Sequence, residues 1–274
     1  ALSGARSVLL LVHGIMGDTL GMSAAAGAGA TPLKNGFDAV LAFDYENIQT
    51  PIEHTGRDLG DKLSDVGITV GGDIRVTAMV HSMGGLVTRC FIEKCNGAPV
   101  IERLVTCGTP HDGSPWPKVE DLALALIGLG LNGILHLGGP LAIAGQVLGS
   151  LTKLTAKLET TLNEMNPSSA FIHGLAHDAD PGLRYVAIRG TRPWPDPSDD
   201  ARAKRIVAKL ANVGFDTVFA GEPNDMAVSV ASASSVGQHW AKPPVLLDAD
   251  CNHISYFSSD LGRAAIEQAL AHPL

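Results

Sequence analysis

Short runs of consecutive apolar residues recur along the chain, and longer segments with a helical period separate them. The first run, residues 7–12, reads Ser-Val-Leu-Leu-Leu-Val and ends in a glycine-rich loop. A strand that is apolar at nearly every position is buried on both faces, which is typical of a parallel sheet covered by helices. Strands are therefore predicted at residues 7–12, 38–43, 74–80, 101–107, 183–190 and 245–247.

The segments between these runs predict helices. In Ile52–Asp65, Leu59 and Leu63 lie one turn apart and charged residues fill the remaining faces. Further helices are predicted after residue 82 as far as Lys94, over 153–164, from Pro167 onward, and over 260–271. Strands that alternate with helices at this spacing indicate βαβ units. We therefore expect an α/β fold with a doubly wound, mostly parallel sheet.

Composition narrows the class of protein. The 274 residues are 45% hydrophobic and 18% charged, which fits one large domain or one domain with an insertion. The formal net charge of -8 and the lack of a Lys/Arg cluster argue against nucleic acid as a partner. Cys90, Cys95, Cys107 and Cys251 lack metal-ligand spacing, so we expect free thiols, with one long-range disulfide as the alternative. No metal and no cofactor is expected.

The start of the chain bears on where the protein acts. No signal peptide is visible, which favours the cytoplasm without deciding the compartment. The chain begins only a few residues before its first predicted strand, which fits a trimmed chain or a piece of a longer protein. Oligomeric state cannot be read from the sequence.

One serine lies where a predicted strand meets a predicted helix. Residues 80–85 read Val-His-Ser-Met-Gly-Gly. A sharp turn here would lift the Ser82 hydroxyl above the sheet edge and direct the first N–H groups of the helix to the same point. Positions two before and two after the serine come close in such a turn; Gly84 suits this and Val80 does not. The alternative is an ordinary connection in which Ser82 caps the helix.

Residues 81–85, His-Ser-Met-Gly-Gly, resemble the nucleophile elbow of the lipases and esterases of the α/β-hydrolase superfamily, with Val80 in place of the first glycine of G-x-S-x-G. The resemblance implies an oxyanion hole. In that family one N–H comes from the residue after a His-Gly pair, here Ile15, and the other from the residue after the nucleophile, here Met83. The alternative is that His13-Gly14 is only a strand-ending turn.

A serine nucleophile needs an imidazole to take its proton and an acid to orient the imidazole. In this fold the chain order is serine, acid, histidine. Of the ten histidines, His253 is the expected base, since it follows the last predicted strand within Asn-His-Ile, which is similar to the family motif. Asp225 is the expected acid, because Asn-Asp-Met-Ala-Val at 224–228 resembles the Asp-Gly-x-Val loop of the family. Its rivals are Glu222, Asp216, Asp248 and Asp250.

Two further segments are interpreted through the resemblance to this family. Residues 108–114, Gly-Thr-Pro-His-Asp-Gly-Ser, are similar to a loop of many bacterial lipases, and His111 is expected to hold that loop. Residues 122–152 carry no charge, and Gly138-Gly139-Pro140 divides them, so two apolar helices are predicted, not a membrane span of about 20 residues. In this fold a lid is inserted at that point, and a buried helical hairpin is the alternative.

Residues 1–114 and 166–274 are therefore predicted to form the α/β-hydrolase core and residues 115–165 an apolar lid, with substrate contacts between Leu122 and Leu151. The implied activity is hydrolysis of carboxylic esters through an acyl-enzyme on Ser82. The lid favours a small-molecule ester or a lipid with a medium-to-long acyl chain, and transient contact with a lipid interface. The alternatives are an acyltransferase or thioesterase on the same scaffold, and a binding protein that retains the fold without catalysis.

Overall fold

A six-stranded parallel sheet forms the centre of the computed structural model, which describes residues 2–15, 17–27, 32–46, 49–115, 159–193 and 218–271. Its order is β2-β1-β3-β4-β5-β6, and neighbouring strands pair in parallel throughout. The strands are β1 (Ser7–Val12), β2 (Ala39–Phe43), β3 (Arg75–His81), β4 (Ile101–Cys107), β5 (Arg184–Gly190) and β6 (Val245–Ala249). The chain moves outward from β1 to β2 and then in the opposite direction from β3, as in a doubly wound sheet.

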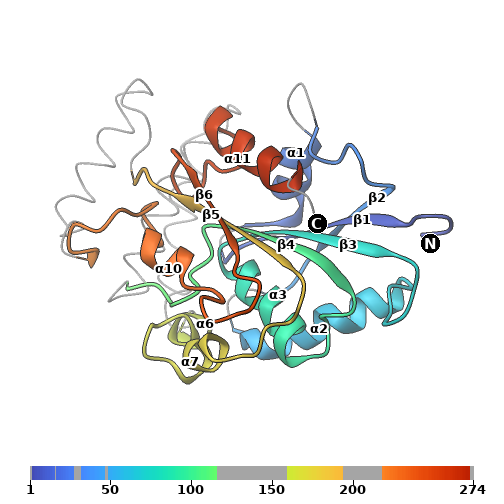
Figure 1. Ribbon diagram of the computed structural model, residues 1–274, viewed down its shortest axis with the longest axis horizontal. Helices are drawn as coiled ribbons and strands as arrows, with labels where there is room; N and C mark the ends of the chain where they lie inside the picture. Colours follow the sequence, from blue (N-terminus) through green and yellow to red (C-terminus); the bar gives the residue numbers. More distant parts are fainter. Residues whose placement is uncertain are drawn as a thin grey trace, which may run out of the picture.

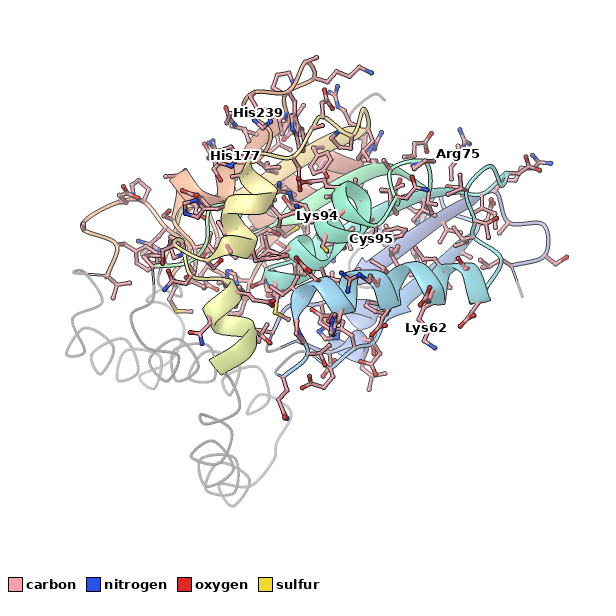
Figure 2. The ribbon with its side chains drawn as sticks, turned by 90° about the horizontal axis from the view of Figure 1, so that it is seen from below. Lys62, Arg75, Lys94, Cys95, His177 and His239 are labelled. Carbon is pink, nitrogen blue, oxygen red and sulfur yellow. The ribbon has the colours of Figure 1, made fainter. Side chains whose placement is uncertain are left out.

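Helices cover both faces of this sheet (Figure 1). The helices of the first face are α2 (Ile52–Asp65), α3 (Met83–Lys94), α6 (Glu159–Glu164) and α7 (Ala170–Ala176), and Figure 2 shows α2, α3 and α7 side by side. The second face carries α1 (Thr19–Gly27) and α11 (Asp260–Ala271), and α10 (Val230–Ser234) lies near β5. The predicted fold class is confirmed.

The two-sided covering explains the uninterrupted apolar strands. In β1, Val8, Leu10 and Val12 belong to the core beneath α2 and α3, whereas Leu9 and Leu11 belong to the core beneath α1 and α11. All five side chains are at most 1% exposed. Burying such a side chain contributes about 1.5–3 kcal/mol, so both faces of the strand are fixed by the helices that cover them.

One predicted helix begins later than expected, and one observed helix was not predicted. The helix predicted from Pro167 begins at Ala170, because the Ser169 hydroxyl accepts a hydrogen bond from the Ile172 N–H at 3.1 Å and so acts as the N-cap. Helix α1 was not predicted, because its small residues form no apolar stripe.

Several predictions lie outside the described residues. They include nearly all of the lid at 115–165, with the suspected substrate contacts between Leu122 and Leu151, and the rival acid Asp216. Of the helix predicted over 153–164, the described part is α6. Within the ranges that the structure describes, no helix has the length and apolar character needed to cross a membrane.

Candidate active site

Ser82 lies in the sharp turn between β3 and α3. Its backbone angles are φ 53° and ψ -126°, a region that non-glycine residues rarely adopt and that stores strain at functional sites. Its N–H donates to the Cys107 carbonyl at 2.9 Å, and its carbonyl accepts from the Gly85 N–H at 3.0 Å. The side chain makes no capping hydrogen bond to the helix. The reading of Ser82 as an ordinary N-cap is therefore wrong, and the turn has the form of a nucleophile elbow.

Gly84 and Val80, the residues two positions after and two before Ser82, have different surroundings. A Cβ on Gly84 would lie 2.6 Å from the Val12 carbonyl oxygen and would also meet the His13 carbonyl oxygen. Val80 is fully buried in the hydrophobic core beneath α2 and α3. The need for a small residue at position 84 therefore comes from the end of β1, and the valine side chain packs elsewhere.

The loop after β1 lies directly against the serine. A Cβ on Gly14 would lie 2.7 Å from the Ser82 Cβ, so only glycine permits this approach. Ile15, the next residue, is 5% exposed. Met83 is the first residue of α3, and N–H groups in the first turn of a helix have no acceptor within the helix. The two expected oxyanion donors thus belong to segments that adjoin Ser82, and their joint action on one oxygen remains a prediction.

His253 and Asp225 form a buried pair. The ring Nδ1 lies 2.8 Å from the Asp225 Oδ2, and the two side chains are 2% and 1% exposed. The His253 N–H also donates to the Asp225 carbonyl oxygen at 2.8 Å. Asp225 Oδ1 accepts from the N–H groups of Ala227 at 3.0 Å and Val228 at 2.8 Å. A carboxylate oxygen accepts, so Nδ1 donates in this hydrogen bond, and Nε2 is the ring nitrogen that the carboxylate does not bind.

The rival acids lie elsewhere. Glu222 is exposed. Asp248 pairs with Arg189 at 2.6 Å, and Asp250 pairs with Arg192 at 2.6 Å. Among the described candidates, the structure therefore brings Asp225 to His253 and holds Asp248 and Asp250 in ion pairs with arginines.

His81 connects the elbow to the His253 loop. Its Nε2 lies 2.7 Å from the His253 carbonyl oxygen, which only accepts, so His81 Nε2 carries a proton. The two rings lie 4.7 Å apart. Burial, and then the neighbouring imidazole of His253, lower the pKa of His81 to about 3. His81 is therefore neutral at ordinary pH and acts as a fixed donor beside the nucleophile.

Ser82 follows β3 and His253 lies in the loop after β6, at the edge of the sheet where the parallel strands end. In the part of the chain that the structure describes, no direct hydrogen bond joins the Ser82 hydroxyl to the His253 ring. Such bonds in hydrolases are often long before substrate binds and shorten in the reactive complex. The described contacts that link the two residues are the hydrogen bond from His81 to the His253 backbone and the ring contact beside it.

His111 is buried in a polar cluster below the loop after β4. Its Nδ1 accepts from Arg89 at 3.3 Å, and its Nε2 contacts the Thr106 hydroxyl at 3.3 Å. Burial, and then the Arg89 charge, lower the pKa of His111 well below its ordinary value. Arg89 itself is bound to Glu93 at 2.8 Å. These contacts fit the predicted loop-holding role.

One site residue was missed by sequence reasoning. The phenol of Tyr256 lies 2.9 Å from Asp225 Oδ2 and is fully buried. The available signal was a tyrosine three positions after the expected base, because buried tyrosines usually find a partner for the hydroxyl.

The four cysteines are free, as predicted. Among the described residues, no group of three or more His, Cys, Asp and Glu side chains is arranged to hold a metal ion.

Comparison with known proteins gives a family and a fold. A family model described as "Domain of unknown function (DUF7379)" matches residues 1–271. A search of curated proteins finds no match. The structure is similar to the mature form of a lipase from Bacillus licheniformis, with a TM-score of 0.58, 17% identity, and coverage of 97% of this chain and 91% of that chain.

Two further solved structures have the same architecture. A metagenomic carboxyl esterase gives a TM-score of 0.60 at 14% identity, covering 98% of this chain and 75% of that chain. The thioesterase of the prodiginine biosynthetic pathway in Streptomyces coelicolor gives 0.57 at 14% identity, covering 98% and 87%. At such identities the likeness shows the fold alone, and this fold is that of the α/β-hydrolases.

Proposed function

This chain belongs to the DUF7379 family, and from the geometry of its site we propose that it is a serine hydrolase that cleaves carboxylic esters. The observation that carries the proposal is the buried hydrogen bond between His253 Nδ1 and Asp225 Oδ2, at the strand edge where Ser82 occupies a strained elbow. A neutral imidazole with an anchored Nδ1–H presents its other nitrogen as a base, which is what a serine nucleophile needs.

The proposed reaction has two halves. His253 Nε2 takes the Ser82 proton as the hydroxyl oxygen attacks the acyl carbonyl, and Asp225 stabilises the resulting imidazolium. The N–H groups of Met83 and Ile15 stabilise the negative oxygen of the tetrahedral intermediate. The imidazolium then protonates the departing alcohol, which leaves an acyl group on Ser82. His253 then takes a proton from water as the water attacks the acyl-enzyme and forms a second tetrahedral intermediate. This intermediate collapses to release the acid, and the imidazolium returns its proton to Ser82.

The substrate class within this proposal is an ester with a medium-to-long acyl chain. Its support is the charge-free segment 122–152, which follows the loop after β4 in the sequence. A chain-length series of p-nitrophenyl esters, measured below and above the micellar threshold, tests this choice. Preference for acetate with no rise at the interface would rule out the lipidic substrate, and an ester product formed with added alcohols would reassign the activity to acyl transfer.

Labelling with a fluorophosphonate probe tests the hydrolase proposal directly. The folded wild-type protein should react covalently, and Ser82→Ala should lose the reaction. Ser64→Ala is the control, because this exposed serine of α2 has its hydroxyl bound to the Gly60 carbonyl oxygen at 3.0 Å. Absence of labelling in folded wild-type protein would overturn the proposal and favour a binding protein that retains the fold.

A further inference from the structure

Tyr256 joins the end of β5 to the loop that carries Asp225 through its hydroxyl. The phenol oxygen lies 2.6 Å from the Gly190 backbone nitrogen and 2.9 Å from Asp225 Oδ2. A backbone N–H can only donate, so it gives its proton to the phenol oxygen. The phenol proton must then point to the carboxylate. The direction of the hydrogen bond from Tyr256 to Asp225 follows from this chemistry alone.

The carboxylate of Asp225 is therefore met by four donors. Oδ1 accepts from the N–H groups of Ala227 and Val228, and Oδ2 accepts from His253 and Tyr256. Burial, and then the Asp225 charge, hold the pKa of the Tyr256 phenol well above its ordinary value, so it keeps its proton. The imidazole and the phenol thus share one oxygen, and each weakens the pull of that oxygen on the other.

The surrounding backbone is shaped for this pair. Gly108 has φ 57°, and a Cβ there would lie 2.7 Å from Asp225 Oδ2 and 2.9 Å from the Tyr256 hydroxyl. A Cβ on Gly190 would lie 2.7 Å from the same hydroxyl. Two glycines at neighbouring strand ends therefore make the space in which the phenol reaches the carboxylate, and a bulkier residue at either position would push them apart.

We propose that Tyr256 is a positioning residue of the hydrolytic site, which orients the Asp225 carboxylate and limits how strongly that carboxylate stabilises the His253 imidazolium. The inference rests on the proposed function. When the Tyr256 hydroxyl is removed, Asp225 Oδ2 loses one hydrogen-bond donor. More negative charge then remains on the oxygen that faces His253. The ring then holds its proton to higher pH, and the acidic limb of the activity profile moves in the same direction.

Other titratable groups face this pair from several elements. They are His81 from the end of β3 with His13 beside it from the loop after β1, Cys107 from the end of β4, and Cys251 with Asp250 from the loop after β6. Burial first, then in each case a neighbouring group, lowers the pKa of His81 to about 3, raises that of Cys107 well above its ordinary value, and raises that of Cys251 to about 12. Asp250 is bound to Arg192. A shift of the profile that appears in Tyr256→Phe and not in a matched control variant therefore reports on the surroundings of Asp225 and His253.

Tyr256→Phe tests the inference, and Tyr185→Phe is a matched control. Tyr185 is also buried, and its hydroxyl donates to a buried carboxylate, Glu93 Oε1, at 2.7 Å, outside the proposed site. For Tyr256→Phe, the acidic limb of kcat/KM against pH should move up by about 0.5 unit or more, with kcat reduced severalfold and KM unchanged within a factor of about two. For Tyr185→Phe the profile should overlay that of wild type. A Tyr256→Phe profile that also overlays wild type would show that the phenol only packs.

A second measurement separates this inference from the proposed function. NMR titration of the His253 ring needs no turnover, and its midpoint should rise in Tyr256→Phe even if the wild-type protein proves unreactive toward esters and fluorophosphonate. An unchanged midpoint would overturn the role of Tyr256, and an unlabelled wild-type protein would overturn the hydrolase proposal.

If Tyr256→Phe does not fold, a fluorinated form of the protein can test the inference instead. Replacement of the three tyrosines by 3-fluorotyrosine makes each phenol a stronger donor, so the acidic limb should move to lower pH. The shift should persist after Tyr45→Phe or Tyr185→Phe in the fluorinated protein. A shift that disappears with either substitution, or an upward shift, would contradict the assignment to Tyr256.

Discussion

Gly190, the last residue of β5, packs so closely against Asp225 that a Cβ added to it would lie 2.6 Å from the Cβ of the aspartate. The same added atom would lie 2.8 Å from the Cys251 carbonyl oxygen. Because these neighbours are a backbone oxygen and a short side chain, they cannot swing away as the end of a flexible side chain would. The strand end therefore fixes the place of the carboxylate that binds His253.

Gly190→Ala should displace Asp225 and reduce ester hydrolysis. A misplacement of about 1 Å costs on the order of 100-fold in rate, and the strain should lower the free energy of unfolding by about 1–3 kcal/mol. Gly27→Ala is the control, because a Cβ there meets nothing within 4 Å. Steady-state kinetics and urea unfolding of both variants provide the measurements. Full activity in Gly190→Ala would show that the acid tolerates a shift.

The strained backbone at Ser82 predicts a reversal of ordinary glycine and alanine preferences. At φ 53° the alanine of Ser82→Ala keeps the strain, whereas Ser82→Gly relieves it, so Ser82→Gly should be more stable by about 1 kcal/mol although both variants are inactive. At Ser64, in the last turn of α2, the order should reverse, because glycine is worse than alanine in a helix by up to about 1 kcal/mol. Chemical denaturation of the four variants compares the two sites, and equal stability of the two Ser82 variants would mean that the elbow is unstrained.

Asp225→Asn should reduce kcat roughly 10³- to 10⁴-fold with little change in KM, because an amide cannot hold the imidazole in the required tautomer or stabilise its charged form. Glu222→Gln, in the same loop and exposed, should retain wild-type kcat within about twofold. Kinetics on one p-nitrophenyl ester measure both. A large loss in Glu222→Gln with activity retained in Asp225→Asn would reverse the assignment of the acid.

Stability should fall as the solution becomes acidic, because the partly buried His81 and the fully buried His111 are held as neutral rings. Burial lowers the pKa of His81 to about 3 and that of His111 well below its ordinary value, so the unfolded chain binds more protons than the folded one below about pH 6.5. Stability therefore rises with pH between about 3 and 6.5 and is lost on acidification. The two histidines together should remove on the order of 2–3 kcal/mol of unfolding free energy between pH 7 and pH 5.5.

His111→Gln isolates half of this effect. The difference in unfolding free energy between pH 7 and pH 5.5 should shrink by about 1 kcal/mol in the variant, whatever its stability at pH 7. His177→Gln is the control, since His177 is an exposed residue at the C-terminal end of α7, where Figure 2 labels it. Denaturation curves at the two pH values decide the matter, and a pH dependence equal to that of wild type would mean that His111 takes up a proton in the folded protein.

The apolar runs of the sequence were sufficient to predict the sheet, because burial on both faces leaves a continuous local pattern. Ile52–Asp65 and Ile101–Cys107 have the predicted bounds, and the turn at Ser82 and the loop around His253 lie at strand ends as expected. α1 escaped prediction because small residues leave no such pattern, and the start of α7 depended on the Ser169 cap.

By itself, then, the sequence determined where the strands, the turn at Ser82 and the loop that carries His253 lie, since each has a signal within a few consecutive residues. Only the tertiary structure decided which carboxylate meets His253, because Asp225 and His253 are 28 positions apart and other carboxylates in the same part of the chain stood as rivals. The same holds for the phenol of Tyr256 and for the glycine that makes room for it, 66 positions away. A hydrogen bond between distant segments depends on how strand ends pack, and packing leaves no mark on the residues next to each partner.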